Sequence, residues 1–557
     1  MPFNLINEPW LPVVPTGGGE RRWIRPAEVA EAGDVEFAWG RADLNIATYE
    51  LLIGLLSIAF PPKDDDDWLV KLDTPPSVAE LDSAFAPLVP WFNLDGDGPR
   101  FMQDYEGFEG ERLNCDQLFV DGPGDETIEA GKDLFRKDQI VMNVSRPAAA
   151  IMLYALQSHT PGAGRGHYSS LKGKMPLVVL VSPTDKHPEL WRTLWSNVDF
   201  RLELSDEHVD FSTVDSASRV LPWCTAAHRG HHDLGRSHAL HMFFGMPMRL
   251  RLEFQDAEGV CPILGGSDHR MVSGYRRKNS GISYDAHWRH SLVPYLVSSK
   301  ATEAVSLNRR RVTYEYWAGI LFGFAEFNKR GQGLSPPSAL TKFRTCTRSR
   351  IIPFSVHIFG FVNPKKNAKI VDVAEAVVPA FASLNEDCER ALVGVAHNLV
   401  GATRCVVDEI KDRIIDALIV PNHAGARPKS AVRRLKKSDA VLDACEYIVI
   451  DTEQPFRAAL ARIAAREHAD ADALDTAVKA ECEAWITVLR GAALEAFDRA
   501  VPPETLINKR PSEQKAMIEA RKRLVMMFDG NKLRESLGLA PVLPKTKKVK
   551  RSGRRAA

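Results

Sequence analysis

The sequence predicts an α+β protein, with a large mixed N-terminal domain rich in irregular loops and a C-terminal four-helix bundle. Strand-like runs, helical runs and long loops alternate over residues 1–370, whereas residues 371–540 hold four amphipathic helices in succession. The 557 residues are too many for one hydrophobic core. Hydrophobic residues make up 45% of the chain and charged residues 26%, which is typical of soluble globular proteins.

The N-terminal domain begins with helical and strand-like runs of ordinary length. "LLIGLLSIAF" at residues 51–60 is shorter than the roughly 18 residues of a membrane span, so it predicts a buried helix. Residues 148–157 predict a second helix. Apolar runs at 176–181 and 351–362 predict strands, and the alternating "MRLRLEF" (248–254) predicts a half-exposed strand.

The C-terminal domain is predicted from helical periodicity and helix boundary signals. Ser383 and Glu386 have the spacing of a capping box at the start of the first helix. Five apolar residues then share one helical face: Leu392, Val395, Leu399, Ala402 and Val406. Later helices fall at 441–465, with a kink near Pro455, and at 471–501 and 511–530. Residues 541–557 are basic, and we expect them to be disordered, with nucleic-acid contact as an alternative.

Charge is unevenly distributed although the formal net charge is zero. Residues 1–130 carry 26 acidic and 8 basic side chains, so the remainder is strongly basic. This division permits a polyanion as partner if the basic side chains converge on one surface. A charged surface without a ligand is the alternative.

Few motifs indicate catalysis, a cofactor or a metal. The eight cysteines form no CxxC pair and no N-terminal signal is visible, which favours a reduced, cytoplasmic compartment. Neither cofactor nor metal is expected. The one enzymatic alternative is a metal-dependent nuclease, or another enzyme, that uses the His-rich 228–241 region. It requires His228, His231 and His232 to converge with carboxylates, although their spacing matches no standard zinc pattern.

A glycine-rich loop follows the helix at 148–157. Gly162, Gly164 and Gly166 alternate with other residues in "HTPGAGRGHYSSLKGK", and the stretch fits neither a Walker loop nor GxGxxG. Glycine lets the backbone approach a ligand closely, and its N–H groups can donate to phosphates or base edges. An ordinary flexible connector is the alternative.

Several stretches together resemble one known family, that of CasA, the large subunit of the type I-E CRISPR surveillance complex Cascade. The quoted landmarks, in the family's order, are "FNLINEPWLPV", "NLDGDGPRFMQD", "DLFRKDQIVMNVSRPAAAIMLYALQSHTPGAGRG", "LPW", "FFGMPMRLRL" and "GYRRKNSGISYDAHWRHSLVPY". A helical C-terminal bundle follows them. The resemblance covers nearly the whole chain.

The resemblance implies a non-catalytic DNA-recognition subunit of a crRNA-guided complex. Such a subunit recognises the PAM in duplex DNA through the minor groove, wedges the strands apart to start the R-loop, helps hold the non-target strand and recruits the helicase-nuclease. Its expected partners are crRNA, double-stranded target DNA, the helicase-nuclease, and the backbone, 5′-handle-binding and small subunits of Cascade, with no membrane. A purely structural scaffold is a further alternative.

The resemblance also implies site residues. Gly164, Arg165 and Gly166 match the loop that lies against the PAM minor groove. "SGYRRK" matches the segment with the basic PAM contact, which is Arg277 by spacing, with Arg276 and Lys278 as alternatives.

Two further segments are matched by the resemblance, and a third assignment rests on the basic charge of its residues. "LTKFRT" (340–345) resembles the wedge hairpin, with Thr341 and Lys342 where relatives often have Asn-Gln. The loop toward the guide's 5′ handle and neighbouring subunits is matched by Phe135, Arg136 and Lys137, with a core position as the alternative for Phe135. The non-target strand is assigned to four cations of the 421–437 connector: Arg433, Arg434, Lys436 and Lys437.

Overall fold

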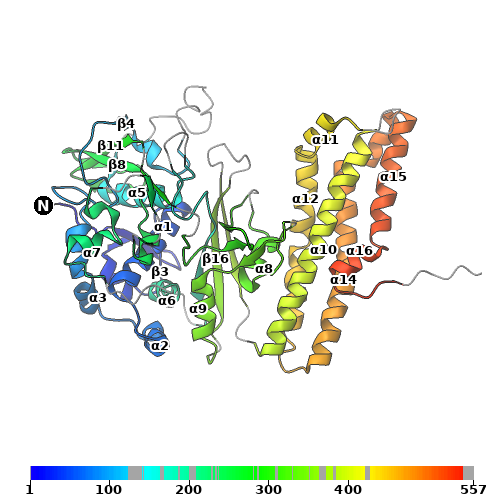
Figure 1. Cartoon of the computed structure of the whole chain (residues 1–557), viewed down its shortest axis with the longest axis horizontal. Helices are drawn as coiled ribbons and strands as arrows, with labels where there is room; N and C mark the ends of the chain where they lie inside the picture. Colours follow the sequence, from blue (N-terminus) through cyan, green and yellow to red (C-terminus); the bar gives the residue numbers. More distant parts are fainter. Residues whose placement is uncertain are drawn as a thin grey trace, which may run out of the picture. The chain divides into compact units, whose positions relative to one another are not determined.

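The computed structural model contains a mixed α/β unit and a helical unit (Figure 1). It describes residues 2–122, 141, 143–162, 168–185, 189–199, 209–226, 230–232, 235, 237–279, 281–284, 288–307, 311–328, 330–350, 352–362, 372–380, 384–420 and 427–542. The first unit comprises Met1–Val312 and Gly319–Ser383, and the second comprises Thr313–Ala318 and Leu384–Ala557.

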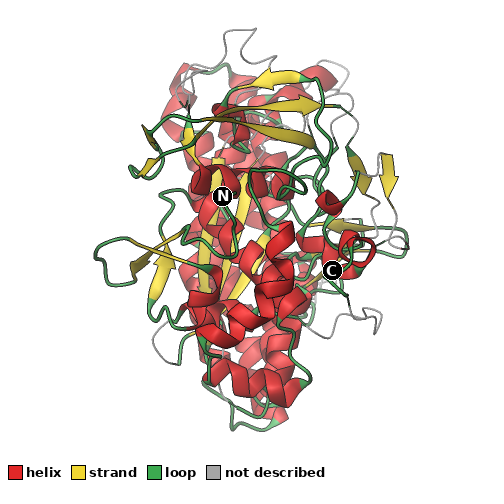
Figure 2. Ribbon diagram, turned by 90° about the vertical axis from the view of Figure 1, so that its left-hand side faces the viewer, coloured by secondary structure: helices red, strands yellow, loops and turns green. Residues whose placement is uncertain are grey.

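Small sheets separated by helices build the first unit, as Figure 2 shows. In one sheet β11 (Met271–Lys278) is central, with β8 (Arg249–Gln255) on one edge and both β4 (Glu111–Leu113) and β5 (Val144–Ser145) on the other. In a second, β16 (Phe354–Val362) lies between β6 (Val178–Pro183) and β17 (Asp372–Pro379), all antiparallel. The other described strands are β1 (Leu11–Pro15), β2 (Arg22–Ile24), β3 (Val35–Phe37), β7 (Gly230–His232), β9 (Gly259–Val260), β10 (Ser267–Asp268), β12 (Ile282–Tyr284), β13 (Tyr295–Val297), β14 (Thr302–Ala304) and β15 (Gly333–Ser335).

The core of the first unit is centred on α1 (Ala42–Ala59) and α5 (Arg146–His159), which pack against each other. α1 is the one described helix that is long and apolar enough to cross a membrane, and it is mostly buried inside the fold. The prediction of a buried helix at 51–60 is therefore confirmed. The other described α-helices of this unit are α2 (Asp65–Asp73), α3 (Val78–Phe85), α6 (Leu190–Ser196), α7 (Val214–Ser218) and α9 (Ser338–Cys346). Helix α8 (Tyr314–Phe322) is divided between the two units, after Ala318.

The second unit holds the four predicted helices, the second of them in two pieces. Their bounds are α10 (Glu386–Leu418), α12 (Asp439–Asp451) with α13 (Glu453–Ala464), α14 (Ala471–Ala500) and α15 (Pro511–Met527). Two short helices, α11 (Lys429–Leu435) and α16 (Asn531–Ser536), accompany them. The second helix breaks at Thr452, close to the expected kink, and Pro455 lies in the first turn of α13, where no N–H is needed. The apolar face predicted for α10 is buried.

Two boundary predictions were wrong. The units divide after Ser383 rather than after residue 370, because β17 pairs along its whole length with β16 of the first unit. The N-cap of α10 is Asn385, whose side chain accepts a hydrogen bond from the Cys388 N–H at 2.8 Å, and not Ser383.

A short segment from the middle of the sequence belongs to the core of the helical unit. Tyr314 stacks on Phe456 with ring centroids 4.3 Å apart, and its hydroxyl bonds to the hydroxyls of Thr403 and Thr452 at 2.9 Å. Residues Thr313–Ala318 therefore cluster with the helices, although the sequence places them far from the bundle.

Candidate nucleic-acid interface

The described stems of the glycine-rich loop lie close together. α5 ends at His159, and the Ser170 N–H donates to the Thr160 carbonyl at 2.9 Å. Gly162 has φ of +75°, in the left-handed region that favours glycine. Gly164, Arg165 and Gly166 lie outside the described residues, as do Phe135, Arg136 and Lys137.

The first stem is tied to the strand beside β11. Gln157 of α5 donates through Nε2 to the Met248 carbonyl at 2.9 Å and accepts from the Met248 N–H at 3.0 Å. Arg249, the next residue, lies opposite Lys278 in the β8–β11 register. The entrance to the glycine loop and the end of β11 are thus neighbours through a short path of backbone contacts.

The three cations of β11 have different environments. Arg276 Nε pairs with Glu253 at 2.7 Å. Arg277 faces inward, with its side chain 13% exposed, and pairs with Glu111 of β4 at 2.8 Å. Lys278 is exposed at the end of the strand, and its ammonium lies 5.8 Å from the centre of the Phe108 ring. Of the three, Lys278 is the cation best placed to meet a ligand.

A glycine is required where β11 bends toward these cations. Gly274 has φ of +155°, and a Cβ there would lie 2.6 Å from the Leu113 carbonyl oxygen of β4. The register of β11 against β8 shifts between Val272 and Gly274, so the bend is a β-bulge. Any side chain at this position would push β4 away from the strand that carries Lys278.

The prediction of a wedge hairpin at residues 340–345 is wrong, because this segment is part of helix α9. Apolar residues at helical spacing, Ala339, Leu340, Phe343 and Cys346, are buried and account for the helix. Thr341 is exposed, but Lys342 is 3% exposed and points into the fold. Its ammonium lies 3.9 Å from the centre of the Trp68 ring and donates to the Ser196 carbonyl at 3.2 Å.

Lys342 also lies away from the cations of β11. Figure 1 shows α9 and β11 at opposite ends of the first unit. The structure therefore does not bring together the three places that the sequence joined in one DNA site. The glycine-loop stems and the end of β11 are neighbours, whereas Lys342 of α9 is enclosed beside Trp68.

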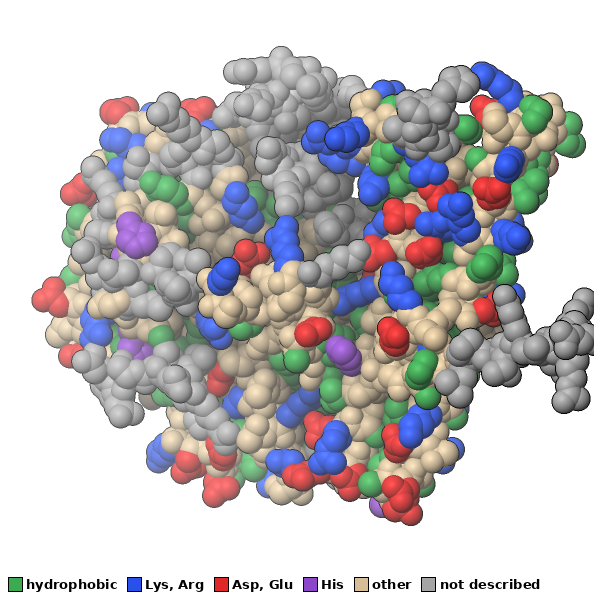
Figure 3. Space-filling view, turned by 45° about the vertical axis from the view of Figure 1, so that its right-hand side comes forward, with side chains coloured by type: hydrophobic (Ala, Val, Ile, Leu, Met, Phe, Trp, Pro, Cys, Tyr) green, Lys and Arg blue, Asp and Glu red, His purple; other side chains and the backbone are tan. Residues whose placement is uncertain are grey.

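The connector cations of the helical unit are exposed. Within the described part of the chain, Arg433, Arg434 and Lys437 pair with no carboxylate, and the Lys436 ammonium lies 4.0 Å from Asp412. Over the face of the helical unit that Figure 3 shows, basic side chains stand among acidic ones. Cations without such partners are suited to contact a polyanion.

The His-rich region does not form a cluster of metal ligands in the residues described. His231 is exposed, whereas His232 stacks on His241 with ring centroids 5.5 Å apart. His241 contacts the Val220 carbonyl and the Tyr284 hydroxyl, both at 3.0 Å, and burial lowers its pKa to about 3. His228 lies outside the described residues, in which no group of three His, Cys, Asp or Glu side chains is placed to hold a metal ion.

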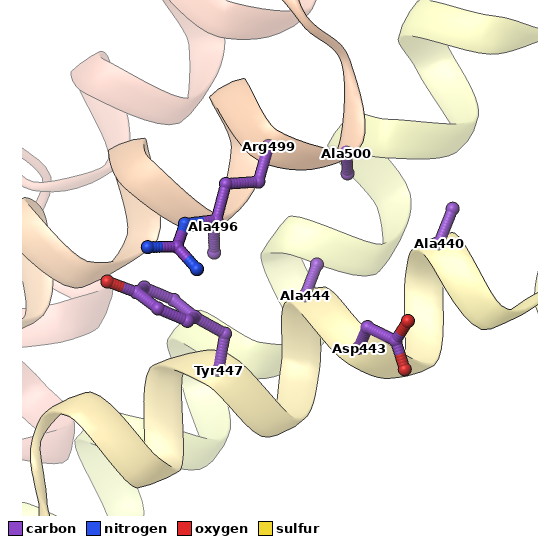
Figure 4. A pocket seen from close by; sticks show the side chains of 7 residues that line it. All are labelled: Ala440, Asp443, Ala444, Tyr447, Ala496, Arg499 and Ala500. Atoms are coloured by element: carbon purple, nitrogen blue, oxygen red, sulfur yellow. The ribbon is translucent and has the colours of Figure 1, made fainter.

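A groove of about 300 Å³ lies between α12 and α14 (Figure 4). Four of its lining residues are alanines, and the others are Asp443, Tyr447 and Arg499. The Arg499 guanidinium covers the Tyr447 ring at 4.0 Å and pairs with Glu495 at 2.7 Å. One carboxylate among methyl groups and an already paired cation forms no acid–base or nucleophilic set.

Sequence reasoning missed two features beside these candidates. One is the long hairpin β16–β17, whose first strand was predicted and whose second was not. The other is Glu50, a fully buried carboxylate in the middle of α1. The available signal was an acidic residue within an otherwise apolar helical run, since such a residue requires a buried partner.

Comparisons with known proteins agree with this fold. The model of the family described as CRISPR-associated protein Cse1 matches residues 4–496. Thermobifida fusca Cse1 is similar in structure, with a TM-score of 0.66 at 16% identity, over 96% of this chain and 98% of that one. Thermus thermophilus CasA (Cse1) is similar with a TM-score of 0.64 at 17% identity, over 94% of this chain and 99% of that one. A chain of a CRISPR RNA-guided surveillance complex is similar with a TM-score of 0.60 at 13% identity, over 94% of this chain and 99% of that one.

Proposed function

The chain belongs to the CRISPR-associated protein Cse1 family, that of the CasA large subunit of type I-E Cascade, and on this premise we propose that it recognises the PAM in duplex DNA. It acts in the cytoplasm as a non-catalytic subunit, assembled with crRNA and the other Cascade subunits. Base pairing with the guide supplies the long sequence specificity, and this subunit reads the short motif beside it.

The observation that carries the proposal is the neighbourhood of Lys278 and the first stem of the glycine loop. Gln157 and Met248 tie the loop's first stem to the start of β8, opposite the end of β11. Gly164 and Gly166 supply a backbone without Cβ atoms, which suits a close approach to the narrow minor groove. Lys278, rather than the paired Arg277, is the basic contact, and Arg165 adds a second cation from the loop.

We assign strand separation to the β16–β17 hairpin instead of α9. The two strands pair continuously from Ser355 opposite Pro379 to Val362 opposite Asp372, and β16 also pairs with β6, so the sheet holds both strands firmly. The sequence that joins them contains Lys365 and Lys366, cations suited to DNA phosphates. We assign contact with the displaced strand to α11, and the subunit offers a surface for the helicase-nuclease.

The test is PAM-dependent binding by the complete crRNA-containing complex. Gly166→Asp places a side chain and a negative charge against the groove, so we expect the Kd for PAM-containing duplex to rise at least about tenfold, or ~1.4 kcal/mol. Gly17→Asp is the matched control, since Gly17 is exposed with no atom within 4 Å of an added Cβ. A randomised PAM library measures selectivity in the same samples.

Two results would count against the proposal. Equal binding by the Gly166→Asp and Gly17→Asp complexes, with assembly intact, would indicate a purely structural subunit. DNA cleavage by the isolated chain would favour the enzymatic alternative.

A further inference from the structure

A buried ionic cluster lies directly behind the stems of the glycine loop. Glu50 of α1 forms an ion pair with Lys172, and its two carboxylate oxygens lie 3.2 Å from His159 Nε2 and 3.2 Å from His290 Nε2. Glu50 and His159 have no exposed surface, and His290 and Lys172 are 2% and 4% exposed. Three separate parts of the chain thus converge on a carboxylate that a fourth part carries.

The protonation states follow from the contacts. His290 Nδ1 accepts a hydrogen bond from the Leu292 N–H at 3.2 Å, so the proton of a neutral ring is on Nε2, which faces Glu50. Burial lowers the pKa of both His159 and His290, which favours neutral rings. Burial alone would raise the pKa of Glu50, but Lys172 and the two histidines hold it well below its usual value. The Glu50 carboxylate is therefore the one anion of the cluster, and the Lys172 ammonium is its one cation.

The members of the cluster bracket the glycine loop in sequence. His159 is the last residue of α5, and Lys172 lies six residues after Gly166. Between them, the Ser170 N–H donates to the Thr160 carbonyl at 2.9 Å, and the Ser170 hydroxyl donates to the Gly173 carbonyl at 2.9 Å. One buried carboxylate therefore contacts a residue of each stem of the segment that carries Gly164 and Gly166: it pairs with Lys172 and lies 3.2 Å from His159 Nε2.

We infer that Glu50 is a positioning residue for PAM recognition, since it fixes both stems of the glycine loop through His159 and Lys172. The inference rests on the proposed function. Glu50 does not contact DNA; it limits the separation of the stems, so that the stems lose less conformational freedom on binding. An anion with buried partners is suited to this role, because moving either stem would leave a charge unpaired in the core.

Two readouts on the assembled complex test the inference. In Glu50→Gln we expect hydrogen exchange at the Ser170 and Gly173 amides to accelerate at least about tenfold, because their stems lose a common anchor. The Kd for PAM-containing duplex should rise about tenfold, whereas binding to duplex without a PAM should stay the same. Exchange is measured without DNA, so it does not depend on the proposed function.

Two further variants separate positioning from general stability. Glu50→Gln combined with Lys172→Met removes both charges together, which avoids an unpaired ammonium and keeps the chain folded. Asp268→Asn is the matched control, because it removes the charge from another buried pair, with Arg146, whose guanidinium lies 2.8 Å away. We expect the double variant to show fast exchange and weak binding, and the control to show neither.

The outcomes distinguish the inference from the function on which it rests. Unchanged exchange at Ser170 and Gly173 in a folded Glu50 variant would overturn the inference. Faster exchange with unchanged PAM affinity would also overturn it, provided that Gly166→Asp weakens binding. If Gly166→Asp binds normally, the proposed function fails, and exchange alone then decides whether Glu50 fixes the stems.

Discussion

Burial determines what each lysine does in this protein. Lys278 and Lys342 both lie in segments that the sequence assigned to DNA contact, yet one is exposed at a strand end and the other is enclosed by Trp68 and the Ser196 carbonyl. A cation held over an aromatic ring, with its N–H bonded to a carbonyl, contributes to stability and is unavailable to DNA.

These two environments predict opposite effects of substitution. Lys342→Ala should lower the free energy of unfolding by about 2 kcal/mol, since it leaves a cavity and an unsatisfied carbonyl, and should leave PAM affinity unchanged. Lys278→Ala should weaken PAM binding and leave stability within about 0.5 kcal/mol. Urea unfolding and DNA titration of both variants measure the contrast. Weakened DNA binding by a stable Lys342→Ala protein would contradict it.

Local pattern decided the type of most elements, but not their use. In α9, buried apolar residues at helical spacing make a helix of a segment that the family resemblance assigned to a hairpin. Helix α11, by contrast, buries no residue and displays Arg433 and Arg434 on an exposed surface without carboxylate partners in the described structure.

The exposed cations of α11 predict a salt-dependent effect. Arg433→Ala with Arg434→Ala should weaken binding to the displaced single strand and reduce the slope of log K against log salt by roughly 1.4, at about 0.7 per phosphate contact. Arg390→Ala is a suitable comparison, since this arginine is exposed and pairs with Asp387 at 2.9 Å. R-loop binding measured over a salt series gives both slopes. An unaltered slope in the double variant would exclude α11 from the strand's path.

At the scale of the whole molecule, buried neutral histidines link stability to pH. Burial lowers the pKa of His159, His241 and His290, so below about pH 6.5 the unfolded chain binds protons that the folded chain does not. Stability is therefore fully present above this pH and is lost as pH falls. The lowered pKa of Glu50 adds a further loss below about pH 4.5.

Urea unfolding at pH 7 and pH 5 should reveal this linkage. Each histidine that stays neutral contributes up to about 2 kcal/mol to the loss at pH 5. His241→Gln should reduce the difference between the two pH values, because Gln does not titrate, whereas substitution of the exposed His468 should preserve it. A pH dependence unaffected by His241→Gln would show that this ring is not buried neutral.

The sequence by itself determined the α+β class, the four C-terminal helices, the buried helix at 51–60 and the family resemblance, because periodicity, caps and short motifs are local properties. The tertiary structure alone decided that β17 extends the first unit, that Tyr314 packs among the helices, that Lys342 points inward and that Glu50 meets His159, Lys172 and His290. These contacts join residues far apart in the chain. Which residues meet across such separations depends on how whole helices and strands pack. A short stretch of sequence does not contain that information.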